Sequence, residues 1–181
     1  MLKTKKNSKI KAIILTADDF EDMEVYFPYF RLLEEGIEVD IAAPNKGTIH
    51  GENGYSLKIE KTFEEINPDD YNLLIIPGGS PNGAPTTVRK NIRAQKIAKS
   101  FFKQNKFVAT ICHGPYLLVS ANLVNGRSLT SYWHDNVPEE IKKAGGKWID
   151  KEVVVDGNLI SSRWPFDLPY FMKELMKMIK K

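Results

Sequence analysis

The feature that most constrains the fold of this chain is a nearly all-apolar run, residues 107–111, that stops at its only cysteine. Cys112 is followed by a His-Gly-Pro tripeptide and then by a second apolar segment, residues 116–119. This order predicts a buried strand, a sharp turn and a helix that begins at Pro115, because proline favours the first helical position. Such a turn lifts one side chain above the carboxyl edge of a sheet and directs a helix N-terminus at it.

Cys112, at the apex of this turn, is predicted to be a reactive thiol. The positive end of the helix dipole favours the thiolate, so we expect a thiol pKa below the ordinary value of about 8.5. A thiolate attacks carbonyl carbons and is oxidised by peroxide. His113, the next residue, is a candidate general base. The alternative for Cys112 is a small buried core residue, which free cysteines most often are.

Short apolar runs alternate with helical patterns along the rest of the chain. Strands are predicted at residues 10–15, 37–43, 73–76, 107–111, 128–131, 148–149, 153–155 and 159–162. Helices are predicted between residues 23 and 36, with Pro28 at its start or at a kink, and at residues 88–104, 115–119, 139–144 and 169–181. Asn53-Gly54 predicts a β-hairpin over residues 47–59. Apolar strands that alternate with helices indicate an α/β fold, with a mostly parallel sheet covered on both faces.

Composition and charge limit the classes of function. The 181 residues include 26 basic and 23 acidic side chains, and the net charge of +3 is too balanced for a nucleic-acid-binding protein. Four lysines fall within residues 1–9, which we expect to form a disordered basic tail. No apolar run reaches the length of a membrane-spanning helix, and no amphipathic pattern supports a membrane-targeting tail. Neither nucleic acid nor a membrane is therefore an expected partner.

Cysteine and histidine usage limits the compartment and the cofactors. A single cysteine excludes an internal disulfide and suits a reducing, cytoplasmic environment. The three histidines, His50, His113 and His134, show no metal-ligand spacing with it. We therefore expect no metal site.

Three predicted strands end in segments of unusual composition: the acidic residues 17–24, Pro-Gly-Gly at 77–79, and Cys112-His113. The carboxyl ends of parallel strands meet at one edge of a sheet, where such folds bind ligands. The N–H groups of Gly78, Gly79 and His113 could form an oxyanion hole there, although a plain tight turn also explains the two glycines.

The acidic segment contains five carboxylates, most of which we expect to cap a helix or to lie in solvent. A carboxyl that points into the crevice would be desolvated and would keep its proton. It could then donate a hydrogen bond to a thiolate. The alternative is that all five are solvated.

Several motifs together resemble the PfpI family of intracellular cysteine proteases, within the wider ThiJ/PfpI superfamily. They are Phe20–Glu24, Pro77–Gly79, Ala109–Pro115, Glu152–Asn158 and Ser161–Arg163, and the match runs in order from about Ile10 to the C-terminus. The resemblance implies a flavodoxin-like three-layer sandwich formed by one domain, residues 10–181. It also implies a cytoplasmic homodimer or hexamer without a metal or organic cofactor.

The same resemblance implies roles for individual residues. Cys112 would be the nucleophile, Glu24 would hydrogen-bond to its sulfur, and Gly79 and His113 would supply oxyanion N–H groups. In the PfpI proteases the histidine is oriented by a glutamate of a neighbouring subunit, just after Pro-Gly-Gly. Residues 77–90 contain no carboxylate here, and Thr86 takes the place of the acid. We therefore expect weak proteolysis, because the imidazolium would lack an orienting anion.

Three functions follow from these features. The first is a cysteine hydrolase that acts on peptide or amide-like carbonyls. The second is a glyoxalase-like or deglycase-like enzyme acting on small reactive aldehydes, in which Tyr132 or His134 moves protons and Glu21 borders the substrate pocket. The third is a stress sensor or chaperone in which Cys112 is oxidised to the sulfinate.

Overall fold

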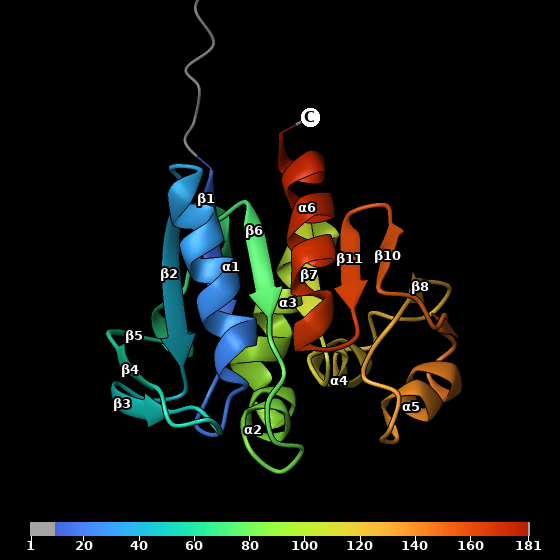
Figure 1. Ribbon diagram of the computed structural model, residues 1–181, viewed down its shortest axis with the longest axis horizontal. Helices are drawn as coiled ribbons and strands as arrows, with labels where there is room; N and C mark the ends of the chain where they lie inside the picture. The colour runs from blue at the N-terminus through green and yellow to red at the C-terminus, as the bar shows by residue number, and fades with distance from the viewer. Residues whose placement is uncertain (1–9, 181) are drawn as a thin grey trace, which may run out of the picture.

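A seven-stranded sheet lies between helices on both of its faces in the computed structural model, which describes residues 10–180 (Figure 1). The strand order is β10-β11-β7-β6-β1-β2-β5, and every pair is parallel except β10 with β11. The bounds are β1 Lys11–Leu15, β2 Glu38–Ala43, β5 Lys61–Thr62, β6 Leu73–Ile76, β7 Phe107–Ile111, β10 Val153–Asp156 and β11 Leu159–Ser162. The predicted three-layer α/β sandwich is confirmed, whereas the predicted basic tail, residues 1–9, lies outside the described residues.

Two apolar layers hold the helices to the sheet. Helices α1, Asp22–Glu34, and α6, Leu168–Ile179, cover one face, and α2, Ala84–Lys90, α3, Ile92–Lys103, and α4, Pro115–Ser120, cover the other (Figure 1). Side chains of the strands alternate between the layers, so that Ile14 packs beneath α6 and Ile13 beneath α3. The predicted inward residues of α6 are all buried: Leu168, Met172, Leu175 and Ile179.

Smaller elements complete the described chain. The predicted hairpin is confirmed as β3, Gly47–His50, paired antiparallel with β4, Ser56–Ile59. The strand predicted at 128–131 is shorter, β8 Ser128–Leu129, and pairs with β9, Lys147–Trp148. The remaining elements are α5, Val137–Lys143, and three short 3₁₀ helices at Phe63–Glu65, Pro68–Asp70 and Pro165–Asp167.

The single helix predicted over residues 88–104 is wrong, because the chain forms two helices there. Asn91 breaks the run with an extended backbone, and its side chain caps α3 by accepting from the Ala94 N–H at 3.0 Å. An asparagine side chain competes with the helical backbone and favours such a cap.

Helix α1 turns much of its apolar surface to the outside. The residues whose spacing predicts this helix, Met23, Phe27, Phe30 and Leu33, are each 40–60% exposed. The helix begins before Pro28, at Asp22, and buries Glu24, Val25 and Leu32 instead. No helix within residues 10–180 is long and apolar enough to cross a membrane.

Candidate active site

The sharp turn predicted after β7 is present and is held from both sides. Cys112 joins β7 to α4 with a φ of 60°, in the left-handed region that few residues other than glycine adopt. Its N–H donates to the Ser162 carbonyl at 3.2 Å, and its own carbonyl accepts from the Tyr132 N–H at 3.0 Å. A Cβ on Gly114 would lie 2.2 Å from the Ile76 carbonyl oxygen, so the turn requires glycine there. The left-handed backbone of Cys112 costs about 1–3 kcal/mol, and backbone strain of this kind is typical of functional sites.

The two glycines after β6 bring backbone against this turn. A Cβ on Gly78 would lie 2.8 Å from the Cys112 Cβ and 2.9 Å from the His113 nitrogen, so no side chain fits. The Gly78 N–H donates to Glu24 Oε2 at 2.7 Å. The prediction that this N–H serves an oxyanion is therefore wrong, since the carboxyl occupies it. The Gly79 N–H donates to no group within residues 10–180 and is free to bind an oxyanion.

Glu24 is the carboxyl of the acidic segment that enters the site. It lies in the first turn of α1 and has no exposed surface. Burial raises the pKa of Glu24 to about 8, although the hydrogen bond from Gly78 lowers it. Its second oxygen, Oε1, has no partner in the described part of the chain, and the Cys112 thiol is close enough for each group to shift the pKa of the other. The carboxyl is therefore protonated at neutral pH and can donate to the sulfur.

The thiol of Cys112 does not have the low pKa that the turn predicts. Burial raises its pKa well above the ordinary value, and Glu24 raises it further once its carboxyl ionises, while the backbone N–H of His113 opposes both effects. Burial outweighs the helix dipole here, because α4 is only six residues long. The resting side chain is consequently a neutral thiol, which needs a base in order to react.

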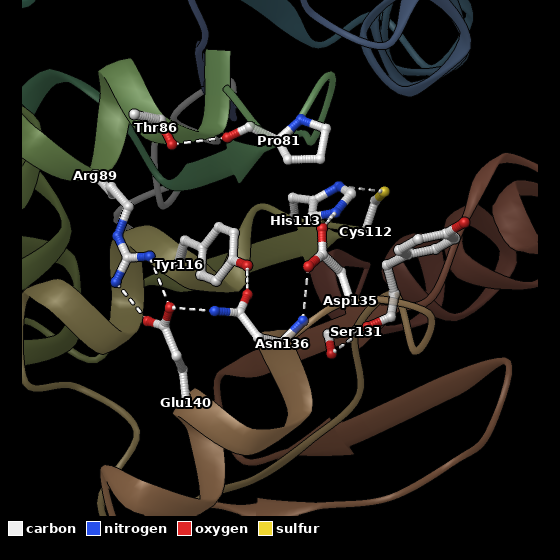
Figure 2. A network of polar contacts seen from close by, with 11 residues as sticks. Pro81, Thr86, Arg89, Cys112, His113, Tyr116, Ser131, Asp135, Asn136 and Glu140 are labelled. Atoms are coloured by element: carbon white, nitrogen blue, oxygen red, sulfur yellow. Dashed lines mark hydrogen bonds and ion pairs between the residues drawn. The ribbon is translucent and has the colours of Figure 1, made fainter. Parts of the chain in front are cut away.

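His113 lies between this thiol and a carboxylate (Figure 2). Its Nδ1 is 3.2 Å from Cys112 Sγ, and its Nε2 is 3.3 Å from Asp135 Oδ2. Burial lowers the pKa of His113, whereas the hydrogen bond and charge of Asp135 raise it. The expectation that the ring lacks an anion is therefore wrong, because an acid outside residues 77–90 orients it within the same chain.

Asp135 is the site residue that the sequence does not identify. It lies in the loop that follows β8. The three segments that the sequence does identify also follow predicted strands, and this position is the only feature that Asp135 has in common with them. Thr86, predicted to take the place of the acid, donates instead to the Pro81 carbonyl at 2.7 Å (Figure 2).

A polar network holds the loop that carries Asp135 (Figure 2). The Asn136 N–H donates to Asp135 Oδ1 at 2.8 Å, which fixes the oxygen that does not face the histidine. The Asn136 side chain accepts from the Tyr116 hydroxyl and donates to Glu140 at 3.3 Å. The Arg89 guanidinium donates to both carboxylate oxygens of Glu140, at 3.1 and 2.5 Å, and so connects the loop to α2. Bidentate pairs of this kind add geometric specificity.

The three predicted pocket residues have different positions. The ring of Tyr132 packs against His113 with centroids 5.0 Å apart, and exposed His134 lies 5.7 Å from Tyr132. Glu21 instead caps the N-terminus of α1 and accepts from the Asn53 amide at 2.9 Å. Within residues 10–180, no cluster of three or more His, Cys, Asp or Glu is arranged to hold a metal ion.

Known proteins match nearly the whole described chain. Residues 10–178 match the DJ-1/PfpI family. The deglycase PfpI of Pyrococcus furiosus is 49% identical over 94% of this chain and 100% of its own. The putative cysteine protease YraA of Bacillus subtilis is 34% identical over 94% of this chain and 98% of its own. The solved structure of Schizosaccharomyces pombe DJ-1 gives a TM-score of 0.83 at 25% identity, covering 94% of this chain and 92% of that one.

Proposed function

Since the chain belongs to the DJ-1/PfpI family, we propose that it is a cysteine-dependent hydrolase whose Cys112 attacks carbonyl carbons. The observation that carries the proposal is the contact series within one chain, in which His113 joins the thiol at 3.2 Å to Asp135 at 3.3 Å. A nucleophile, a base and an orienting acid in this order form the arrangement that acyl-transfer enzymes on unrelated folds share.

Because Cys112 rests as a neutral thiol, its proton must be removed when the sulfur attacks. As Sγ of Cys112 bonds to the carbonyl carbon, its proton passes to Nδ1 of His113, and Asp135 stabilises the resulting imidazolium. The N–H groups of Gly79 and His113 stabilise the oxyanion. The imidazolium then protonates the leaving amine, and a water molecule hydrolyses the thioester after giving a proton back to the histidine.

Deglycation is the second candidate, and the protonated carboxyl of Glu24 favours it. In the adduct of an amine with the aldehyde of a 2-oxoaldehyde, Sγ of Cys112 displaces the amine, which leaves with the thiol proton. A proton must then move from the sulfur-bearing carbon to the neighbouring carbonyl carbon before a thioester forms. Glu24, buried beside the sulfur with a pKa of about 8, suits such a transfer near neutral pH. Water then releases a 2-hydroxy acid and restores the thiol. The name of the Pyrococcus furiosus relative supports this candidate.

We propose further that the chain is a single domain over residues 10–181 and acts in the cytoplasm as a homo-oligomer on peptide or small carbonyl substrates. The single cysteine supports the reducing compartment. The exposed apolar face of α1 supports self-association, because monomers rarely leave such a face uncovered.

The test is turnover with matched variants. A fluorogenic peptide amide reports amide hydrolysis, and lactate formation from the methylglyoxal adduct of N-acetyl-lysine reports deglycation. Cys112→Ser should abolish both activities, whereas Thr86→Val, on the outside of α2, should change neither. Turnover that survives in Cys112→Ser would contradict the proposal. So would the absence of both activities in a protein whose Cys112 is readily oxidised to sulfinate by peroxide, which is the behaviour of a sensor.

A further inference from the structure

Four aromatic side chains form a continuous series that begins at the catalytic histidine. Tyr132 lies 5.0 Å from His113, Trp133 lies 5.5 Å from Tyr132, Trp164 lies 5.3 Å from Trp133, and Phe166 lies 4.7 Å from Trp164, all between ring centroids. We refer to residues 132, 133, 164 and 166 as the aromatic patch. The first three rings are half-buried, and Phe166 is 74% exposed.

The patch lies at the edge of the sheet where such folds bind ligands. Two of its members follow β8 and the other two follow β11. Strand β11 runs parallel to β7, with Ser162 level with Ile111, so that residues 163–166 leave the sheet beside Cys112. The carboxyl ends of parallel strands form the binding crevice of open α/β sheets. The patch is therefore an extension of the active site.

A charged cluster contacts the patch at Trp133. The guanidinium of Arg163 lies 5.2 Å from the centre of the Trp133 ring. Asp167 and Asp150 hold that guanidinium at 2.8 and 2.9 Å, and Glu152 lies 3.7 Å from it. Three carboxylates around one cation leave an acidic surrounding, which disfavours a nucleic acid with its phosphate backbone.

The exposed ring of Phe166 indicates that something apolar covers this surface. It packs against Trp164 yet keeps most of its surface in water, although burying such a ring is favourable. Tilted rings 4.7–5.5 Å apart leave their faces and edges available to a further aromatic ring, because aromatic pairs prefer such geometry.

We propose that the aromatic patch is a subsite for an aromatic side chain of an extended peptide, located two to four residues from the carbonyl that Cys112 attacks. An extended chain rises about 3.3 Å per residue, so successive rings of the patch lie one to two residues apart along it. The proposal rests on the proposed function for the identity of the nucleophile. It makes a polypeptide segment, rather than a free small aldehyde, the preferred substrate.

The test measures alkylation of Cys112 and needs no turnover. Acetylated tetra-alanine chloromethyl ketone is compared with reagents in which one alanine at a time is replaced by phenylalanine. The sulfur bonds to the methylene carbon as its proton passes to His113, and chloride leaves with the electron pair of the broken C–Cl bond. Phenylalanine two to four residues from the ketone should accelerate the reaction about three- to tenfold, the worth of one aromatic pair.

Matched variants locate the effect. Phe166→Ser and Trp164→Leu should bring the favoured reagent to within about twofold of the alanine reagent when both are measured on the same variant. Phe30→Ser, which removes a ring on α1 that is 60% exposed, should leave the acceleration intact.

The outcomes separate the subsite from the proposed function. If the alanine reagent does not label Cys112, the proposed nucleophile is wrong. If it labels but phenylalanine gives no gain at two to four residues, or gives a gain that both variants keep, the subsite is wrong. A gain that disappears on dilution, together with a smaller assembly in Phe166→Ser, would also overturn it by showing that the patch binds a second copy of the chain.

Discussion

Replacing Glu24 with glutamine should stabilise the protein at neutral pH. Burial raises the pKa of this carboxyl from 4.5 to about 8, so the folded chain keeps a proton that the unfolded chain loses. Between these two values the unfolded state binds fewer protons, and the stability falls as the pH rises through the window. Each pKa unit corresponds to about 1.4 kcal/mol, so at pH 7 the carboxyl costs about 3 kcal/mol relative to a neutral side chain of the same shape.

Glutamine is that neutral side chain. Its amide oxygen can accept from the Gly78 N–H, as Oε2 does at 2.7 Å, and its amide nitrogen can donate toward the Cys112 sulfur. We therefore expect Glu24→Gln to raise the free energy of unfolding by about 3 kcal/mol at pH 7 and to change it little near pH 4.5.

Urea unfolding between pH 4.5 and 8 measures this difference. The control is Glu34→Gln on the same helix, where the side chain is 73% exposed and pairs with Arg31 at 3.1 Å. It should show no comparable gain that grows with pH. A Glu24→Gln variant that is less stable than the unmodified protein at pH 7 would refute the reasoning, because it would show that the folded chain holds an ionised, stabilised carboxylate.

Three further changes test the site. Hydrolysis of the peptide amide by the unmodified protein should slow as the pH rises through about 8, where Glu24 loses the proton that it donates to the sulfur. A pH profile of kcat/KM for this substrate should show that Glu24→Gln lacks the fall. Gly78→Ala should lower kcat/KM at least about 100-fold, because its Cβ would lie 2.8 Å from that of Cys112. The same clash should lower the free energy of unfolding by about 1–3 kcal/mol. Turnover measures the first effect and urea unfolding the second. Asn136→Ala should free the loop of Asp135, lower kcat/KM about tenfold and move the pKa of His113 down, which the acidic limb of the same profile reports.

Sequence patterns predict the frame of the site well, because that frame depends on short-range rules. The apolar run before Cys112, the proline after it and the Asn-Gly hairpin each involve only neighbouring residues. The helix break at Asn91 is harder to predict, since an asparagine cap competes with helix-forming residues on both sides.

Asp135 and the pKa of the Cys112 thiol depend on contacts that local sequence patterns do not contain. Asp135 reaches His113 only because β8 and its loop fold back beside the turn, and 22 residues separate the two in the chain. The pKa of Cys112 depends on its burial in a cluster to which β1, β6, β11 and α6 contribute, which no local pattern contains. Both properties come from long-range packing.

The measurement that tests the central claim most directly is the effect of Asp135→Asn on the hydrolysis of the peptide amide. If Asp135 orients His113 and stabilises its imidazolium, kcat/KM should fall about 10²–10³-fold, less than the 10⁴ of a fully buried triad because this carboxylate is partly exposed. Alkylation of Cys112 by the alanine chloromethyl ketone needs His113 to take the thiol proton but expels no amine, and it should therefore fall less than hydrolysis. A hydrolytic rate within threefold of the unmodified protein would contradict the claim that one chain supplies nucleophile, base and acid.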